Sequence, residues 1–185
     1  MTGAPLTITR LGNPLLREKT RHLTKKEILS DETQQLIANM KAIVASKKYG
    51  VGLAAPQVGY GLALSVIAIK PTPNRPELEP FESVIINPEI VAAHGYRKQL
   101  WEGCISAGKN KDTLFAKVPR YKSVTLKWLD EHAKPHQEKL TGFPAHVAQH
   151  EVDHLNGIMF VDRVKDSTSF MMQDEYLTRV VKRRL

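Results

Sequence analysis

The sequence predicts an α+β domain in which mixed or antiparallel β-sheets pack around a central helix, with a further helix toward each terminus. Three observations lead to this fold class. Residues 62–69 and 83–91 are rich in β-branched side chains, as strands are. Residues 123–140 alternate apolar and polar side chains around the turn sequence DEHAKP, which favours a hairpin. Residues 142–157 read as a helix, with Pro144 in its first turn and Gly157 at its end.

The N-terminal helix is expected over residues 31–46, with Ser30 as its N-cap. The apolar side chains of this stretch recur at helical spacing, which predicts one face packed on a sheet. They are Leu36, Ile37, Met40, Ile43 and Val44. The C-terminal helix is expected from Ser167 onward, as an exposed element.

Two irregular segments separate the expected elements. Residues 49–61, YGVGLAAPQVGYG, are punctuated by glycine and predict a loop with turns. Residues 70–80, KPTPNRPELEP, contain four prolines and predict a surface loop rather than a linker between domains.

Length and composition favour one soluble domain. With 185 residues, 42% of them hydrophobic and 25% charged, the chain is interpreted as a single domain over residues 1–185. There is no apolar run of membrane-spanning length, and the first residues lack the pattern of a secretory signal. The single cysteine excludes an intramolecular disulfide and fits a reducing compartment. A cytoplasmic protein without membrane contact is therefore expected.

The chemistry of the chain concentrates in residues 149–157, QHEVDHLNG. On a helix, His150 and His154 project from the same face and can bind one metal ion, with Glu151 placed to act on water at that metal. The alternative is a helix that carries two buried, hydrogen-bonded histidines. His146 and His150 form a second pair with the same spacing, but only the later pair encloses a carboxylate next to its first histidine. His146 is therefore expected to line a pocket or to cap the helix.

A hydrolytic metal site needs a third protein ligand and an open position. Phe160 stands where a metzincin protease would have its last histidine, and Asp174 and Glu175 lie near the spacing of a thermolysin-like glutamate. The other candidate is Cys104, within WEGCISAG, although most free cysteines are inert and buried. Residues 50–59, GVGLAAPQVG, add glycines that allow a peptide to approach the backbone and Gln57 as an amide donor for an oxyanion.

Taken together, GVGLAAPQ, EGCIS and QHEVDHLNG resemble the ordered motifs of peptide deformylases, and the resemblance runs from ITRLGNPLLR to GIMFVDRV. It implies an enzyme that removes the formyl group from the N-terminal formyl-methionine of new polypeptides and releases formate. It also implies one divalent metal ion held by Cys104, His150 and His154, natively Fe(II) and often zinc or nickel after purification. Glu151 would act as general base and acid, while Gln57 and the Ile105 N–H would stabilise the oxyanion.

The resemblance also indicates where the substrate binds. An extended peptide is expected along the backbone of Val51, Gly52 and Gly103. Val51, Phe143, Val147 and His150 are expected to form the pocket for the methionine side chain, and Arg120 to help organise the substrate side of the site.

Three features depart from the family pattern or leave alternatives open. Residues 107–117 form an insertion that can alter recognition beyond the methionine, and His146 replaces an apolar residue or an arginine. The basic ending of the C-terminal helix, Lys182, Arg183 and Arg184, predicts ribosome contact through RNA phosphates, in a chain of net charge +8. The alternative is a solvated helix end with favourably placed cations. No contact with DNA is expected.

Overall fold

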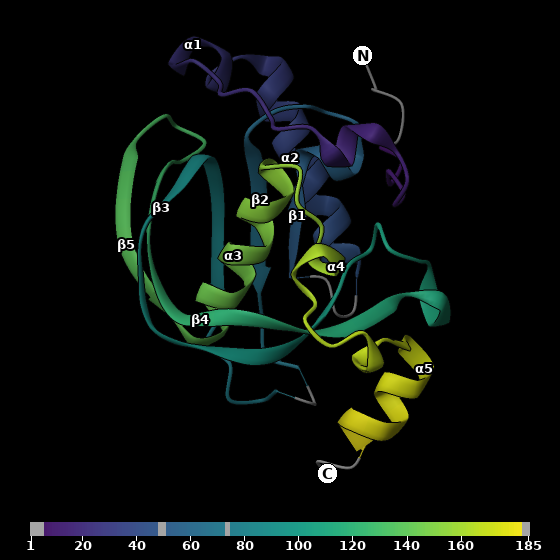
Figure 1. The fold of residues 1–185 in the computed structure, drawn as a ribbon. Helices are drawn as coiled ribbons and strands as arrows, with labels where there is room; N and C mark the ends of the chain where they lie inside the picture. Colours follow the sequence, from purple (N-terminus) through teal and green to yellow (C-terminus); the bar gives the residue numbers. More distant parts are fainter. Residues whose placement is uncertain (1–5, 48–50, 73–74, 183–185) are drawn as a thin grey trace.

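The computed structural model describes residues 6–47, 51–72 and 75–182 (Figure 1). In this part of the chain the strands form one antiparallel sheet in the order β1-β2-β3-β4-β5, and β6 pairs with β4 beyond this path. The strands are β1 (Gly52–Ala54), β2 (Leu64–Ile69), β3 (Phe81–Gly103), β4 (Leu114–Leu129), β5 (Pro135–Thr141) and β6 (Met171–Met172).

Among the described residues, five α-helices accompany the sheet, together with short 3-10 turns and one π-helical segment. The α-helices are α1 (Lys25–Ile28), α2 (Asp31–Ser46), α3 (Gly142–Leu155), α4 (Phe160–Arg163) and α5 (Gln173–Tyr176). The 3-10 turns are η1 (Pro14–Arg17), η2 (Ala55–Val58), η3 (Asn110–Asp112) and η4 (Ser167–Ser169), and the π-helical segment η5 (Leu177–Val181) continues α5. None of the described helices is long and apolar enough to cross a membrane.

Helix α2 confirms the prediction for residues 31–46. The Ser30 side chain accepts a hydrogen bond from the Thr33 N–H and caps the helix. Met40 and Val44 are buried in a cluster that also contains Leu64 and Val66 of β2. The amphipathic pattern therefore marks the face that packs on the sheet.

Helix α3 packs on the opposite face of the same strand, and Figure 1 shows the sheet curving around it. Ile67 and Ile69 of β2 belong to the cluster that contains Val147 and Val152 of α3. Successive strand residues face opposite sides, so β2 has one helix on each face. This explains why almost every residue of β2 is buried. The central helix and the α+β arrangement are as predicted.

The strand predicted over residues 83–91 is much longer than expected. β3 runs from Phe81 to Gly103. It pairs with β2 over Phe81–Ile86 and with β4 from Ile86 to Gly103, with three register shifts against β4. One shift lies between Ile86 and Glu89, where Asn87 adopts a positive φ of 51° and Pro88 cannot donate to a ladder. These irregularities bend the strand without ending it, and they carry it to the residue before Cys104.

The other boundaries also need correction. The predicted loop over residues 49–61 contains the short strand β1 and the turn η2. The hairpin is confirmed, but its first strand begins at Leu114, within the 107–117 insertion. The C-terminal helix begins at Gln173 and not at Ser167, because a 3-10 turn and strand β6 precede it. That residues 1–185 form one domain stays a prediction.

Candidate metal centre and active site

Cys104, His150 and His154 come together in the structure. Cys104 follows the last residue of β3, while the two histidines lie one turn apart on α3. One potential ligand atom from each residue lies within 4.8 Å of the other two. The Cys104 Sγ is 3.4 Å from Nε2 of His154. Bending of β3 and packing of α3 on the sheet therefore place a sulfur and two imidazoles around one point.

The Cys104 thiol is buried and lies in a field that favours its anion. Burial raises its pKa, but the nearby His154 and His150 outweigh this effect and bring the pKa well below the usual value of a thiol. The thiolate is the form that binds metals. The surroundings of Cys104 therefore favour the thiolate, the form that a metal site would need.

Glu151 is buried beside the three candidate ligands. Burial raises its pKa to about 7, against the lowering effect of His150 and His154. Its Oε2 has no hydrogen-bond partner among the described residues, and the carboxylate lies against the backbone of β1. A Cβ atom at Gly52 would stand 2.1 Å from the Glu151 Oε1. Glycine at position 52 therefore makes room for this carboxylate.

Gln57 is held with its amide NH2 toward Cys104. The Ala54 N–H donates to its Oε1 at 2.8 Å, which fixes the orientation of the amide. Its Nε2 then donates to the Cys104 Sγ and to the Ser106 Oγ, both at 3.2 Å. The turn η2, directly after β1, thus places an amide donor at the candidate metal centre.

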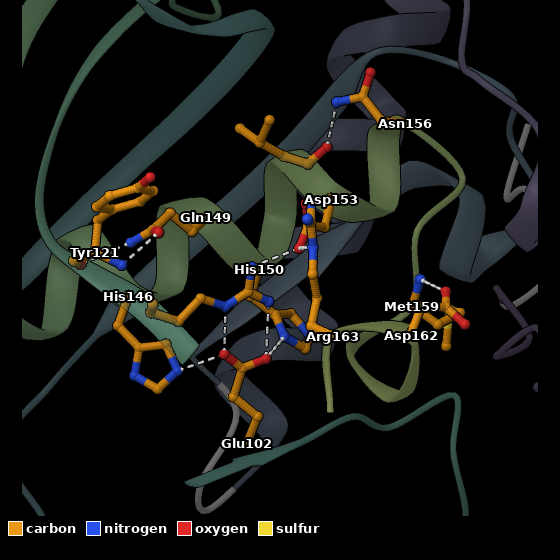
Figure 2. Close-up of polar contacts among 12 residues, drawn as sticks. Glu102, Tyr121, His146, Gln149, His150, Asp153, Asn156, Met159, Asp162 and Arg163 are labelled. Atoms are coloured by element: carbon orange, nitrogen blue, oxygen red, sulfur yellow. Dashed lines mark hydrogen bonds and ion pairs between the residues drawn. The ribbon is translucent and has the colours of Figure 1, made fainter. Parts of the chain in front are cut away.

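Glu102 connects the site to the elements behind it (Figure 2). Its Oε2 lies 2.8 Å from Nδ1 of His150, and its Oε1 lies 2.8 Å from Nε2 of His146. Arg120 donates to both oxygens, at 2.6 and 3.0 Å. Burial raises the pKa of this carboxyl, but His146, His150 and Arg120 outweigh it and hold the pKa well below its ordinary value. An ionised Glu102 that accepts from Nδ1 leaves Nε2 of His150 free to face a metal.

Glu102 was not among the site residues predicted from the sequence. The sequence signal for Glu102 was weak: an acidic residue in a strand, directly before Gly103 and Cys104. Such a residue looks like any other strand residue until its partners are known. Those partners, Arg120 on β4 and His146 on α3, lie 18 and 44 residues away.

Arg120 lies behind the site and does not line the cavity described below. Its side chain is only 4% exposed and pairs with Glu102 and with Asp153. Asp153 in turn accepts from Arg163 at 2.6 Å. The position of Arg120 therefore does not support direct contact with substrate, because both ends of its guanidinium are occupied by buried carboxylates.

His146 is buried and is not part of the three-residue cluster. Burial lowers its pKa, and its Nε2 is directed at Glu102. Its ring also meets the ring of Phe143 edge-on, with centroids 5.8 Å apart. His146 thus lines the cavity, as expected, and at the same time supports Glu102.

A cavity of about 270 Å³ opens onto the candidate ligands. Six of the residues predicted to bind substrate line it, namely Val51, Gly52, Gly103, Phe143, Val147 and His150. Gln57, Ile105 and Glu151 line it as well. Two further groups of lining residues were not predicted from the sequence. One comes from the proline-rich loop (Lys70, Thr72, Arg75 and Leu78), and the other comes from Trp101, Phe115 and the C-terminal segment (Gln173, Tyr176, Leu177, Val180 and Val181).

The residues present fit a divalent transition metal. One thiolate and two imidazoles are ligands that suit Fe(II) and zinc, and they leave a coordination position open. The unpartnered, buried Oε2 of Glu151 marks a place for a polar group inside the cavity. Asp174 and Glu175, the protease-type alternatives, are exposed on α5 and stand outside the cluster.

Comparison with known proteins shows the family of the chain. A model of the polypeptide deformylase family matches residues 5–170. Peptide deformylase 2 of Nostoc sp. is 38% identical over 181 residues, which is 96% of each chain. A peptide deformylase of Limosilactobacillus reuteri is 39% identical over 176 residues, covering 88% of this chain and 91% of the relative.

Solved structures give the same result for the fold. The class I type b peptide deformylase from Acinetobacter baumannii, bound to Met-Ala-Ser, matches with a TM-score of 0.79 and 32% identity over 87% of this chain and 99% of that one. The peptide deformylase from Synechococcus elongatus, in complex with actinonin, matches with a TM-score of 0.75 and 34% identity over 97% and 87% of the two chains.

Fold and site together define a metal-dependent hydrolase. The chain belongs to the polypeptide deformylase family, whose members remove the N-formyl group from nascent peptides during protein maturation. The resemblance of its three motifs to this family is confirmed.

Proposed function

We propose that this chain removes the formyl group from the formyl-methionine of newly made polypeptides by means of the residues assembled around Cys104. In this proposal Cys104, His150 and His154 hold one divalent ion, Fe(II) in the cell and zinc or nickel as substitutes. When bound, such an ion polarises a carbonyl oxygen and lowers the pKa of water from about 15.7 to about 7. The observation that carries the proposal is the meeting of this ligand set with Glu151 and Gln57 in one cavity.

Glu151 is proposed to move the proton. Its unpartnered Oε2 takes a proton from the water that attacks the formyl carbon and delivers it to the amine that leaves. The C–N bond of the formamide breaks, and the products are formate and a peptide with a free N-terminal methionine. The Glu151 side chain is buried against Gly52, so bulk water has little access to this carboxylate.

Gln57 and Ile105 are proposed to stabilise the oxygen of the formyl group as it becomes anionic. Nε2 of Gln57 is already oriented toward Cys104 by the bond to its Oε1. The N–H of Ile105 follows Cys104 directly and has no backbone acceptor among the described residues. Two preorganised donors of this kind stabilise the transition state more than the substrate.

The substrate is proposed to bind as an extended strand along Val51, Gly52 and Gly103, with its methionine side chain between Phe143 and Val147. Glycine at position 103 is required for close packing, because a Cβ there would stand 2.5 Å from the Phe115 ring. Ribosome contact stays a prediction. Lys182 is exposed, while Arg183 and Arg184 lie outside the described residues. The cytoplasmic location likewise stays a prediction.

The test is formate release from formyl-Met-Ala-Ser, with protein loaded anaerobically with Fe(II). We expect the wild type to release formate and Glu151→Gln to be slower by about 10²–10⁴-fold, the usual contribution of general acid–base catalysis. Glu32→Gln, an exposed substitution on α2, serves as the matched control and should behave as the wild type. Metal content is measured for all three proteins.

Each result has a definite meaning. Equal rates for wild type and Glu151→Gln, with equal metal content, would refute the role of Glu151. No formate from wild type that carries one metal ion per chain would refute the proposed function.

Gln57→Leu should lower kcat by about 10²–10³-fold with little change in unfolding temperature, as expected for an oxyanion donor.

A further inference from the structure

The C-terminal segment forms one wall of the active-site cavity. Tyr176, Leu177, Val180 and Val181 of α5 and η5 all line it, at spacings that place them on one side of a helix. Thr178 and Arg179 between them are exposed. An apolar helix face thus turns toward the cavity, although this helix was expected to be a solvated element.

Aromatic contacts attach this wall to the strands that carry the metal ligand. The Tyr176 ring stacks on Phe115 of β4, with centroids 4.3 Å apart and planes inclined by 7°. It also meets Trp101 of β3 at 5.4 Å. Phe115 lies directly over Gly103, the residue before Cys104. On the outer side of the helix, Arg179 pairs with Glu175. The wall is therefore fixed beside the reaction centre by the rings of three residues.

The cavity consequently has two apolar groups of lining residues. Phe143 and Val147 of α3, with Leu78 of the proline-rich loop, form the group assigned above to the methionine side chain. Trp101, Phe115 and the C-terminal face form the second group. In an extended peptide, successive side chains leave the backbone on opposite sides. A methionine in the first group leaves the second group for a side chain that follows it. The first following side chain points to the opposite side of the peptide, and the second lies two residues further along the strand.

We propose that the C-terminal wall binds an apolar side chain at one of the two positions after the formyl-methionine, and so sets the substrate preference of this enzyme. The inference rests on the proposed function and specifies its substrate class. A charged side chain at that position would lose its hydration against Leu177 and Val180 without gaining a partner there. The cavity volume of about 270 Å³ is slightly below the usual range of ligand sites, about 300–1,000 Å³, so the cavity holds a short peptide segment and no more.

The experiment compares kcat/KM for formyl-Met-Leu-Ala, formyl-Met-Ala-Leu and formyl-Met-Ala-Ala on the Fe(II)-loaded full chain. We expect the wild type to prefer one of the leucine peptides over the alanine peptide by about tenfold, the usual effect of a few buried methylene groups. Val180→Asp should bring this ratio close to one. Val180→Thr keeps the size of the side chain and should lower the ratio to an intermediate value.

Thr178→Asp is the matched control, because it places the same charge on the exposed side of the same segment and should keep the ratio. Absence of any leucine preference in the wild type would overturn the inference, as would a preference that survives Val180→Asp. Failure of the wild type to deformylate all three peptides, with metal bound, would instead count against the proposed function. The two failures are therefore distinguishable.

Discussion

Gly52 shows how strictly a single residue can be constrained by its neighbour. The carboxylate of Glu151 occupies the space that a Cβ atom would need. We expect Gly52→Ala to displace this carboxylate by about an ångström and to lower kcat by about 10²-fold, since misplacement of that size can cost this much. Metal content should stay at one ion per chain, because the atoms nearest to the added methyl group belong to Glu151 and not to Cys104, His150 or His154.

Gly61→Ala provides the control for this substitution. A Cβ atom at position 61 would stand 3.6 Å from Cδ1 of Leu15, which is an ordinary contact. Gly61 also lies close to the site in sequence, shortly after the turn that carries Gln57. Formate release by Gly61→Ala should match that of the wild type. If Gly52→Ala were equally active, the close approach of Glu151 to β1 would have no catalytic importance.

Glu102 is the second residue with a measurable role of its own. Glu102→Gln removes the charge that His146, His150 and Arg120 share. Partners of metal-binding histidines commonly contribute 10–100-fold to metal affinity, so affinity should fall by about this factor in a competition titration with a chelator. The unfolding temperature should also fall, because Arg120 is left with an incomplete set of carboxylates.

Glu82→Gln is the matched control, since Glu82 is exposed near the start of the same strand. Its metal affinity and unfolding temperature should equal those of the wild type. Unchanged metal affinity in Glu102→Gln would show that His150 is oriented without help from this carboxylate.

Among the elements, the β4–β5 hairpin depends on one charged turn residue. Oδ1 of Asp130 accepts from the His132 and Lys134 N–H groups, and Oδ2 lies 2.9 Å from Nε2 of His136. Burial raises the pKa of Asp130, but these contacts outweigh it and lower the pKa to about 2. Because the pKa of Asp130 is lower in the folded state, its ionised carboxylate stabilises the fold. This contribution to the free energy of unfolding is complete above about pH 4 and is lost as the pH falls toward 2.

Asp130→Asn keeps the acceptor oxygen and removes the charge. We expect it to lower the free energy of unfolding by about 1 kcal/mol or less at pH 5, since solvent weakens the pair. The difference from the wild type should shrink as the pH falls from 4 to 2, as measured by urea denaturation at each pH. A difference that is independent of pH in this range would mean that the charge of Asp130 contributes nothing.

The elements also show what the sequence could and could not predict. Helix α2 was predicted with correct bounds, and α3 with the correct start and an end two residues too late, because caps, glycine and apolar spacing are local signals. The full length of β3 was not predicted, since Asn87 and Pro88 look like a strand end until the partner β4 holds the chain beyond them. The Glu102 contacts and the C-terminal wall were missed for the same reason, because both join segments distant in sequence.

At the scale of the whole molecule, metal binding should be visible as stability. A ligand present at 100 times its Kd adds about 2.7 kcal/mol to the free energy of unfolding. For a domain of this size, that corresponds to a rise in Tm of roughly 5–10 °C. The metal-loaded protein should therefore unfold at a higher temperature than the chelated protein, and readdition of Fe(II) should restore both Tm and formate release.

Cys104→Ser tests whether this effect arises at the proposed centre. The variant should show a much smaller rise in Tm with the same metal, because the thiolate is lost from the ligand set. An equal rise in Tm for the wild type and Cys104→Ser would mean that the stabilising ion binds elsewhere in the chain.

The two tightly packed glycines have a consequence for inhibition. Positions 52 and 103 admit no larger side chain without a clash with Glu151 or Phe115. A compound that gains its affinity from the backbone of these residues leaves the cell few resistance mutations there, since the enzyme would lose its own activity first. A compound that relies on Val180 or Val181 offers an easier escape, because these side chains line the cavity but have no part in the proposed proton transfer.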